Sequence, residues 1–521
     1  MRSAVERARP PRSASLEKWL LGAIVLLALS LRVWAIDFGL PSMYHPDESM
    51  KVRIAQNMFK TGDLNPHYFK KPTLFIYLNA LAYVPYYLVG RVTGRLESPD
   101  DIVPPTMLAM AVGRTPLPST VLMGRLLSTL FATGSVVLIS IVGRRISRRR
   151  LVGLLAALML AVDPNHVANS RHVTENSYLV FLIVATLWAS VCIFQRGKTS
   201  DYVAAGIAAG LAVSSKYNGV LVAMVPVIAH FLRAGAGGFR DTRIVLTLVL
   251  VPVAFFVTTP YALLDHEVFL RDMLPQVTHY ATGHPGMEGN SLIWYLQYMG
   301  RTAGVIYVLA VLEIVRGLWK RCQRTVLLSI FPAVYLAFIS GFVVRNNRTL
   351  LPATPFLFLL AASMLATLFE RAQGLRSTGV RQTATAALIG LVAVALAQPI
   401  YRTAVRAIEL KTVDGRETAR VWIEENLPPG SKVALEAFSP FVDPARFSVQ
   451  GYAYIIDHDP EWYVQNGFEY LIFSQGMYGA FFDNPARYPA QVALYNSFFD
   501  RFTLVRRFSD GGYEVRVYRV D

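Results

Sequence analysis

The sequence predicts a mainly α-helical protein that crosses a membrane about eleven times and ends in a small α/β domain. Of the 521 residues, 53% are hydrophobic and only 17% are charged, which is too little charge for a soluble protein of this length. The basic residues also cluster in short loops between apolar runs, as they do in the cytoplasmic loops of membrane proteins. These loops account for the net charge of +16, so we expect no nucleic-acid partner.

Two apolar runs with basic flanks set the predicted orientation. The run at residues 19–36 follows a basic tail at 1–18, and the run at 121–143 is followed by "RRISRRR" at 144–150. Because cytoplasmic loops carry the positive charge, both basic segments should be cytoplasmic. No small-residue cleavage site clearly follows the first run, so we expect a retained helix and a cytoplasmic N-terminus.

The segment between these two runs is therefore a single external loop, residues 37–120. It contains a further apolar stretch at 73–90, but a crossing there would place "RRISRRR" outside the cell. This stretch also carries Pro85 and four tyrosines, which suit a helix lying along the membrane or re-entering it.

Nine later runs continue the alternation and place the C-terminus outside. They are residues 151–163, 177–195, 202–215, 219–232, 243–259, 292–315, 325–343, 349–369 and 383–399. Together they give a transmembrane module at 19–399 in a plasma membrane of bacterial type. Within it, Gly206 and Gly210 lie four residues apart and predict a close helix contact. Cys192 and Cys322 fall near cytoplasmic ends, so we expect no disulfide framework.

After residue 400 the composition changes to that of an α/β domain, predicted at 400–521. A helix at 415–430 should stop at the two prolines near its end. Strands are predicted at 432–438 and 469–475, and a hairpin with Asp510 and Gly511 in its turn is predicted at 502–520.

Under this topology the conspicuous polar motifs all lie on the external face. They are "YHPDES" (44–49), "NPHYFKKPT" (65–73), "DPNHVANSRHVTEN" (163–176), "SSKYNG" (214–219), "YALLDHE" (261–267) and "RNNRTLLPATP" (345–355). Polar groups at membrane depth usually face a cavity or one another. Carboxylates from one loop and cations from several others therefore predict a site that binds an anion beside a general base.

Five of these stretches resemble a known family. "HPDE", "KKPTLFIYL", "SRHVTEN", "GLAVSSKYNGV" and "RTLLPATPFL", in this order over residues 20–370, resemble the protein O-mannosyltransferases. More broadly, they resemble membrane glycosyltransferases that use polyprenyl-phosphate sugars. The resemblance implies a C-type glycosyltransferase fold, inverting transfer of a hexose or pentose and an external active site. It also implies that Asp47 is the base, whereas Glu175 and Asn176 straddle the position of a second family carboxylate.

The expected chemistry assigns a role to each candidate residue. A carboxylate near the anomeric carbon can take the proton of an acceptor hydroxyl, and cations stabilise the departing lipid phosphate. The predicted catalytic residues are Asp47 and Glu48, and the predicted donor-phosphate ligands are Arg171, Lys216, Arg345 and Arg348. The predicted supporting residues are His45, His67, Lys71, Glu175 and Asn176.

Each assignment has a structural alternative. Asp47 is also a preferred helix cap, and Glu48 is also suited to a supporting hydrogen bond. Arg171 and Lys216 can equally reach lipid headgroups. No two histidines have the spacing of a zinc-binding helix, so we expect no metal and no cofactor, although a divalent ion held by His45 and Asp47 stays an alternative.

The predicted function is transfer of a sugar from a polyprenyl-phosphate carrier to an acceptor hydroxyl on a protein, lipid or glycan. A transporter of a lipid-linked or small anionic substrate is the main alternative, but no paired halves are visible in the sequence. A non-catalytic assembly protein is the second alternative, and it leaves the shared face of Asp, Lys and Arg residues unexplained.

Overall fold

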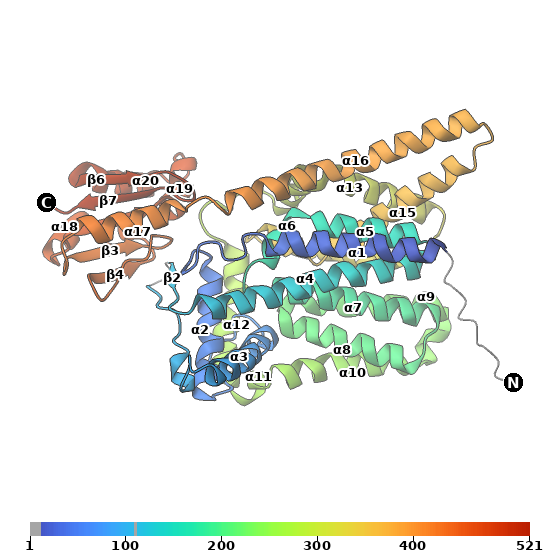
Figure 1. Cartoon of the computed structure of the whole chain (residues 1–521), viewed down its shortest axis with the longest axis horizontal. Coiled ribbons are helices and arrows are strands. Elements are labelled where there is room, and N and C mark those ends of the chain that lie inside the picture. The colour runs from blue at the N-terminus through green and yellow to red at the C-terminus, as the bar shows by residue number, and fades with distance from the viewer. Residues whose placement is uncertain (1–11, 109–111) are drawn as a thin grey trace.

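The computed structural model of the chain describes residues 12–108 and 112–521. A long helical bundle has the C-terminal domain at one end and the first described residues at the other (Figure 1). The predicted tail at 1–18 is only partly described, because residues 1–11 lie outside these ranges. Its remaining residues already belong to helix α1, which begins at Arg12.

The bundle contains a helix at each of the eleven predicted membrane runs. Its elements are α1 (Arg12–Val33), α4 (Pro118–Ser147), α5 (Arg150–Val162), α6 (Pro164–Ser170), α7 (Asn176–Gln195), α8 (Thr199–Ser215), η2 (Tyr217–Ala223), α9 (Met224–Ala234), η3 (Gly235–Arg240), α10 (Arg243–Thr258), α13 (Ser291–Trp319), α14 (Gln323–Ser340), α15 (Thr354–Gln373) and α16 (Thr378–Glu409). Within the described residues, seven helices are long and apolar enough to cross a membrane, or eight if the bent pair α5–α6 is one span. The count of eleven stays a prediction.

The large first loop covers the end of the bundle nearest the C-terminal domain. Its elements are β1 (Ser42–Met43), α2 (Pro46–Thr61), α3 (Leu74–Val92), η1 (Pro99–Asp101) and β2 (Gly113–Arg114). Helix α2 stands across the direction of the bundle helices (Figure 1). Helix α3, at the apolar stretch expected not to cross, is not among the seven candidate spans of the described chain. The same end also holds α11 (Tyr261–Leu264), α12 (His266–Thr282) and η4 (Asn347–Leu350).

The predicted close contact at Gly206 and Gly210 is confirmed between α8 and α10. A Cβ atom on Gly210 would lie 2.4 Å from the backbone oxygen of Val251, and one on Gly206 would lie 2.7 Å from that of Thr247. These oxygens belong to the backbone of α10, which cannot move aside as a flexible side chain could. Hydrogen atoms in place of side chains therefore set how closely these helices approach.

The C-terminal domain is built on a five-stranded sheet of order β4-β3-β5-β7-β6. Its elements are α17 (Gly415–Asn426), β3 (Lys432–Glu436), β4 (Ser448–Tyr452), η5 (Ile455–Asp457), α18 (Pro460–Gln465), β5 (Tyr470–Ser474), α19 (Gln475–Asp483), α20 (Pro489–Arg501), β6 (Thr503–Phe508) and β7 (Val515–Arg519). Strand β3 pairs in parallel with β4 and β5. The predicted hairpin is the antiparallel pair β6–β7.

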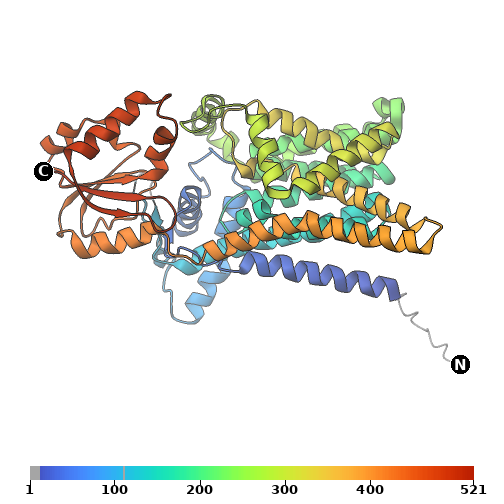
Figure 2. The same cartoon turned by 90° about the horizontal axis from the view of Figure 1, so that it is seen from above.

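The domain and the first loop are joined by polar contacts. Glu417 of α17 accepts hydrogen bonds from Ser42 Oγ at 2.9 Å and from the Tyr44 hydroxyl at 2.7 Å. Seen from above, α16 runs along the bundle and leads directly into this domain (Figure 2). The domain is thereby held at the same end of the bundle as α2.

Candidate active site

Asp47 and Arg348, two residues far apart in the sequence, form an ion pair at this end of the bundle. Asp47 Oδ2 lies 2.8 Å from Arg348 Nη1, and each side chain keeps about a third of its surface exposed, at 34% and 31%. The helix cap is His45, because α2 begins at the next residue, and Asp47 lies within the first turn. The structure therefore contradicts the alternative in which Asp47 is the helix cap.

The surroundings keep Asp47 ionised and His45 neutral. Burial alone would raise the pKa of Asp47, but the positive charges of Lys51 and Arg348 outweigh it and lower that pKa below its ordinary value. Burial, with the neighbouring His172, lowers the pKa of His45 to about 3. A neutral imidazole can accept a hydrogen bond, and His45 Nε2 lies 3.5 Å from Arg348 Nη1. The carboxylate is thus deprotonated, and cations orient it.

A buried charge network continues from Asp47 toward α8. Lys51, one helical turn after Asp47, places its Nζ 2.5 Å from Glu175 Oε2. Lys216 lies 3.9 Å from the other oxygen of Glu175 and donates a hydrogen bond of 3.1 Å to Asn176 Oδ1. Burial lowers the pKa of Lys216 to about 7, although Glu175 raises it. Glu175 and Asn176, which straddle the position of the second family carboxylate, thus both contact lysines.

Glu48 holds the first loop in place. Its two carboxylate oxygens accept from Arg125 Nε at 2.9 Å and Nη2 at 2.8 Å, and Oε1 also accepts from the backbone of Val173. The remaining Arg125 nitrogen donates to the backbone oxygens of Ile36 and Phe38. The Glu48 side chain is fully buried. Such an environment suits a residue that fixes loop geometry, as in the supporting alternative, rather than one that meets a substrate.

Sequence reasoning did not select Lys51 and Arg125, although both left a signal. Lys51 follows Asp47 by four residues, so a helix over this stretch places both on one face. Arg125 lies inside the apolar run of α4, where an ionisable residue is costly and usually has a partner.

A groove beside the ion pair has three lysines and a long apolar lining. Lys70, Lys71 and Lys216 line it, and we call it the lysine groove. Its volume is about 270 Å³. Its apolar lining comes from η2, α12, α14 and the segment after α14: Val220, Leu221, Met273, Val277, Phe338, Ile339, Phe342 and Val344. Thr349, which follows Arg348 in the sequence, also lines it.

A second, larger cavity lies between the first loop and the C-terminal domain. We call it the interdomain cleft; its volume is about 1320 Å³. His45 and His172 line its inner end, with ring centroids 4.5 Å apart. Arg416, Phe438 and Tyr513 of the C-terminal domain line its outer part. Each member of the Asp47–Arg348 pair thus has a near neighbour in the sequence, His45 or Thr349, that lines one of the two cavities.

Three of the predicted residues lie apart from this arrangement. Arg171 donates through Nη2 to the backbone oxygen of Leu31, and Arg345 donates to the backbone oxygens of Glu288 and Gly289. His67 is exposed and pairs with Asp63 at 2.9 Å. None of the three is among the residues that line the lysine groove. Among the described residues, no three His, Cys, Asp or Glu side chains are grouped closely enough to hold a metal ion.

Comparison with known proteins defines the class to which this fold belongs. Solved structures with the C-type glycosyltransferase fold match nearly the whole chain. ArnT from Cupriavidus metallidurans, solved bound to undecaprenyl phosphate, matches with a TM-score of 0.52 and 14% identity over 97% of this chain and 98% of its own. The archaeal oligosaccharyltransferase AglB from Archaeoglobus fulgidus, solved with an inhibitory peptide and a dolichol-phosphate, matches with a TM-score of 0.57 and 11% identity over 98% of this chain and 74% of its own.

A family model narrows the class. The model of the dolichyl-phosphate-mannose-protein mannosyltransferases matches residues 113–262. No curated protein sequence matches the chain significantly. The predicted resemblance, the C-type fold and the enzyme class, a glycosyltransferase of the membrane, are confirmed by these findings.

Proposed function

We propose that the chain transfers a sugar from a polyprenyl-phosphate carrier to an acceptor hydroxyl, with inversion and with Asp47 as the general base. The observation that carries this proposal is the position of the Asp47–Arg348 pair. Thr349, next to Arg348, lines the lysine groove, whereas His45, two residues before Asp47, lines the interdomain cleft. Neighbours of the base and of the cation thus line two separate cavities, which supports a donor site and an acceptor site near the pair.

The lysine groove suits the lipid-linked donor. Its apolar walls along α12 and α14 match a polyprenyl chain, and its lysines match the phosphate. Lys71 and Lys216 act from the groove, and Arg348 acts from its inner end. Arg171 and Arg345, which donate to backbone oxygens, are left out of this proposal.

The reaction follows from this placement. The acceptor oxygen attacks the anomeric carbon from the side of the cleft, and the bond between that carbon and the phosphate oxygen breaks on the side of the groove. The acceptor proton passes to a carboxylate oxygen of Asp47, and the electron pair of the broken bond stays on the lipid phosphate. Attack opposite to the leaving group inverts the configuration at the anomeric carbon.

Arg348 links the two halves of the reaction. In the free protein it pairs with Asp47 and, together with Lys51, lowers the pKa of that carboxylate. A phosphate at the end of the groove would draw the guanidinium away from Asp47. The carboxylate would then become a stronger base when the donor is bound, so it would take the acceptor proton more readily.

The interdomain cleft suits the acceptor. Its outer part brings aromatic rings of Phe438 and Tyr513 together with charged groups such as Arg416 and Asp414. Flat apolar faces beside hydrogen-bonding groups accommodate a sugar, a peptide or a lipid headgroup, the three acceptor classes left open by the sequence. We assign acceptor binding to this cleft and orient the whole end to the outside of the cell.

We also propose that no metal is needed. Arg348, Lys71 and Lys216 place positive charge where a divalent ion would otherwise stabilise the leaving phosphate. Incubation with EDTA, followed by removal of the chelator, should leave the transfer rate unchanged. A rate that falls and returns on addition of Mg²⁺ or Mn²⁺ would contradict this part of the proposal.

The central test is Asp47→Asn, measured with purified protein in detergent and a polyprenyl-phosphate sugar. The substitution keeps the shape of the side chain but removes the base, so transfer should fall by roughly 10²–10⁴-fold while donor binding persists. Glu48→Gln is the matched control in the same helical turn. It should lower thermal stability because Arg125 loses its partner, yet keep measurable turnover. Near-normal turnover of Asp47→Asn would sink the mechanism.

A further inference from the structure

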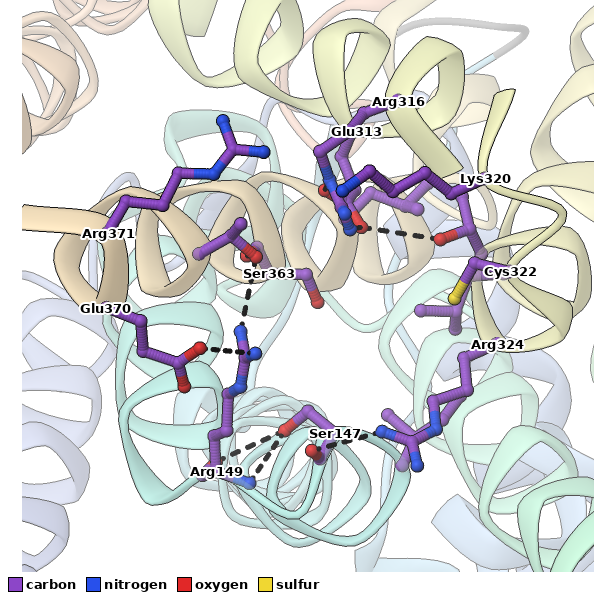
Figure 3. Close-up of a pocket in the computed structure, with 15 residues that line it drawn as sticks. Ser147, Arg149, Glu313, Arg316, Lys320, Cys322, Arg324, Ser363, Glu370 and Arg371 are labelled. Atoms are coloured by element: carbon purple, nitrogen blue, oxygen red, sulfur yellow. Dashed lines mark hydrogen bonds and ion pairs between the residues drawn. The ribbon is translucent and has the colours of Figure 1, made fainter. Parts of the chain in front are cut away.

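A cavity at the other end of the bundle, remote from Asp47, is surrounded by positive charge. Helices α4, α13 and α15 end there, and α5 and α14 begin there. We call it the distal cavity; its volume is about 490 Å³. Figure 3 shows Arg149, Lys320 and Arg324 arranged around one opening. Arg316 and Arg371 complete the set of five cations that line it.

The two carboxylates of this cavity are already neutralised by arginines. Glu313 accepts hydrogen bonds from Arg316 Nη2 at 2.6 Å, from Arg316 Nε at 2.7 Å and from the Thr325 hydroxyl at 3.3 Å. Glu370 pairs with Arg149 at 2.5 Å. These contacts fix two of the five cations as part of the wall. They leave the positive charge of the other three uncompensated.

Those three cations are Lys320, Arg324 and Arg371. Within the described residues, none of them lies within 4.0 Å of a carboxylate oxygen. Arg324 makes only a long contact of 3.3 Å with the backbone oxygen of Ser147. Like charges that converge on one hollow repel one another, so an anion in the hollow would stabilise the group.

Two helix N-termini add to the same field. Helix α5 begins at Arg150 and α14 at Gln323, and neither has a side-chain cap or an acidic residue in its first turn. The positive end of a helix dipole attracts anions, and acidic residues are usually found there. Residues beside both N-termini, Arg149 and Cys322, line the cavity. Uncapped helix ends and unpaired cations therefore point to the same ligand charge.

We propose that the distal cavity binds a phosphate-bearing anion. Arginine forks and a lysine are the side chains that recognise phosphate oxygens in proteins. Two sources carry this phosphate chemistry, the headgroup of an anionic phospholipid and a soluble phosphate compound. At this end of a membrane bundle the lipid source is at hand, because basic pockets between transmembrane helices bind such headgroups.

The lipid arm of the test uses the full chain in phosphatidylcholine nanodiscs with added phosphatidylglycerol, and native mass spectrometry counts the lipid retained. The double substitution Lys320→Gln and Arg324→Gln should weaken retention roughly tenfold or more, since it removes two charge-assisted contacts. The matched control, Arg240→Gln with Arg376→Gln, removes the same charge from exposed positions that do not line the cavity. It should retain the lipid as the unaltered chain does.

The soluble arm titrates inorganic pyrophosphate into the same three proteins in neutral lipid by calorimetry. The cavity pair is the double variant Lys320→Gln with Arg324→Gln. If pyrophosphate binding is lost in the cavity pair but not in the control pair, the site binds a soluble ligand. If lipid retention is weakened in the cavity pair but not in the control pair, the site binds a lipid headgroup. Equal losses in the two pairs would show a general surface field and overturn the proposal, as would binding in neither arm. Unchanged melting in phosphatidylcholine confirms that the cavity pair is folded.

Discussion

At the scale of single residues, one type of charge serves two different purposes at this site. Lys216 lines the lysine groove and Arg348 pairs with Asp47, whereas Arg171 and Arg345 donate to backbone oxygens. The sequence places all four on one face, and that grouping alone predicted a phosphate site. It cannot tell which cations find a carbonyl partner, because that depends on the path of loops that are distant in sequence.

Arg348 should bind the donor phosphate through the planar fork of its guanidinium as well as through its charge. Arg348→Ala should weaken use of the lipid donor by on the order of 2–3 kcal/mol, the cost of a lost charge-assisted contact. Arg348→Lys should restore only part of it, because a point charge cannot replace a planar fork. Transfer rates over a range of donor concentrations measure both. Arg345→Ala is the matched comparison, and an equal loss there would remove the distinction between the two arginines.

Lys216 should make donor use sensitive to pH near neutrality. Its pKa is lowered to about 7, and only the protonated amine attracts phosphate. The ratio kcat/KM for the donor should therefore fall as pH rises above about 7, and Lys216→Arg should move that fall to higher pH because arginine stays charged. A pH profile that is the same in both proteins would show that the fall in kcat/KM above about pH 7 does not come from the titration of Lys216.

At the scale of elements, patterns of charge and apolar residues predicted most of the helices but fewer parts of the C-terminal domain. The bundle runs are long and uniformly apolar, so their positions follow from composition. Strand β4, with the sequence "SVQGY", and helices α18 to α20 gave no such signal. They are short, and their identity is set by packing against the sheet rather than by their own periodicity.

The contact between α8 and α10 offers a test with two opposite signs. Gly210→Ala should destabilise the chain by roughly 1–3 kcal/mol, because its Cβ would meet the backbone of Val251 at 2.4 Å. Gly390→Ala, in the middle of α16 with open space around it, should instead stabilise slightly by removing a helix glycine. Thermal unfolding in detergent measures both. If both variants shift the unfolding temperature by the same amount in the same direction, the close approach of α8 and α10 is not needed for stability.

Strand β3 predicts a pH-dependent stability of the C-terminal domain. Burial raises the pKa of Glu436 from its ordinary value of 4.5 to about 8, although hydrogen bonds from Tyr495 and the Ser474 backbone act against it. The folded domain then holds a proton that the unfolded chain releases. Its stabilisation is complete below about pH 4.5 and is lost as pH rises toward 8, at about 1.4 kcal/mol per pH unit.

Thermolysin cleavage of the full chain within residues 432–519, corrected with an unfolded control at each pH, measures this loss. Glu436→Gln should flatten the profile between about pH 5 and 8. Glu425→Gln, an exposed glutamate on α17, should leave the slope unchanged. A slope that persists in Glu436→Gln would place the responsible group elsewhere.

At the scale of the whole molecule, the two ends of the bundle differ in what their charges do. At one end, Asp47 of α2 and Glu175, which precedes α7, are paired with Arg348 and Lys51. At the other end, arginines such as Arg144 and Arg148 gather where α4 leads into α5, and Lys320 and Arg324 surround the distal cavity. An excess of Lys and Arg in the short loops of one end is the feature that orients membrane proteins, so this end should face the cytoplasm.

This asymmetry predicts where each end lies in the cell. A reporter enzyme that is active only outside the cytoplasm should be active when fused after residue 521 and silent when fused after Arg148. The physical reason is that moving the arginine-rich turn after α4 across the membrane is far costlier than moving the C-terminal domain, which is translocated largely regardless of its charge. The opposite pattern would invert the protein and place Asp47 in the cytoplasm. In that case nucleotide sugars would be at hand, and the requirement for a lipid-linked donor would lose its topological basis.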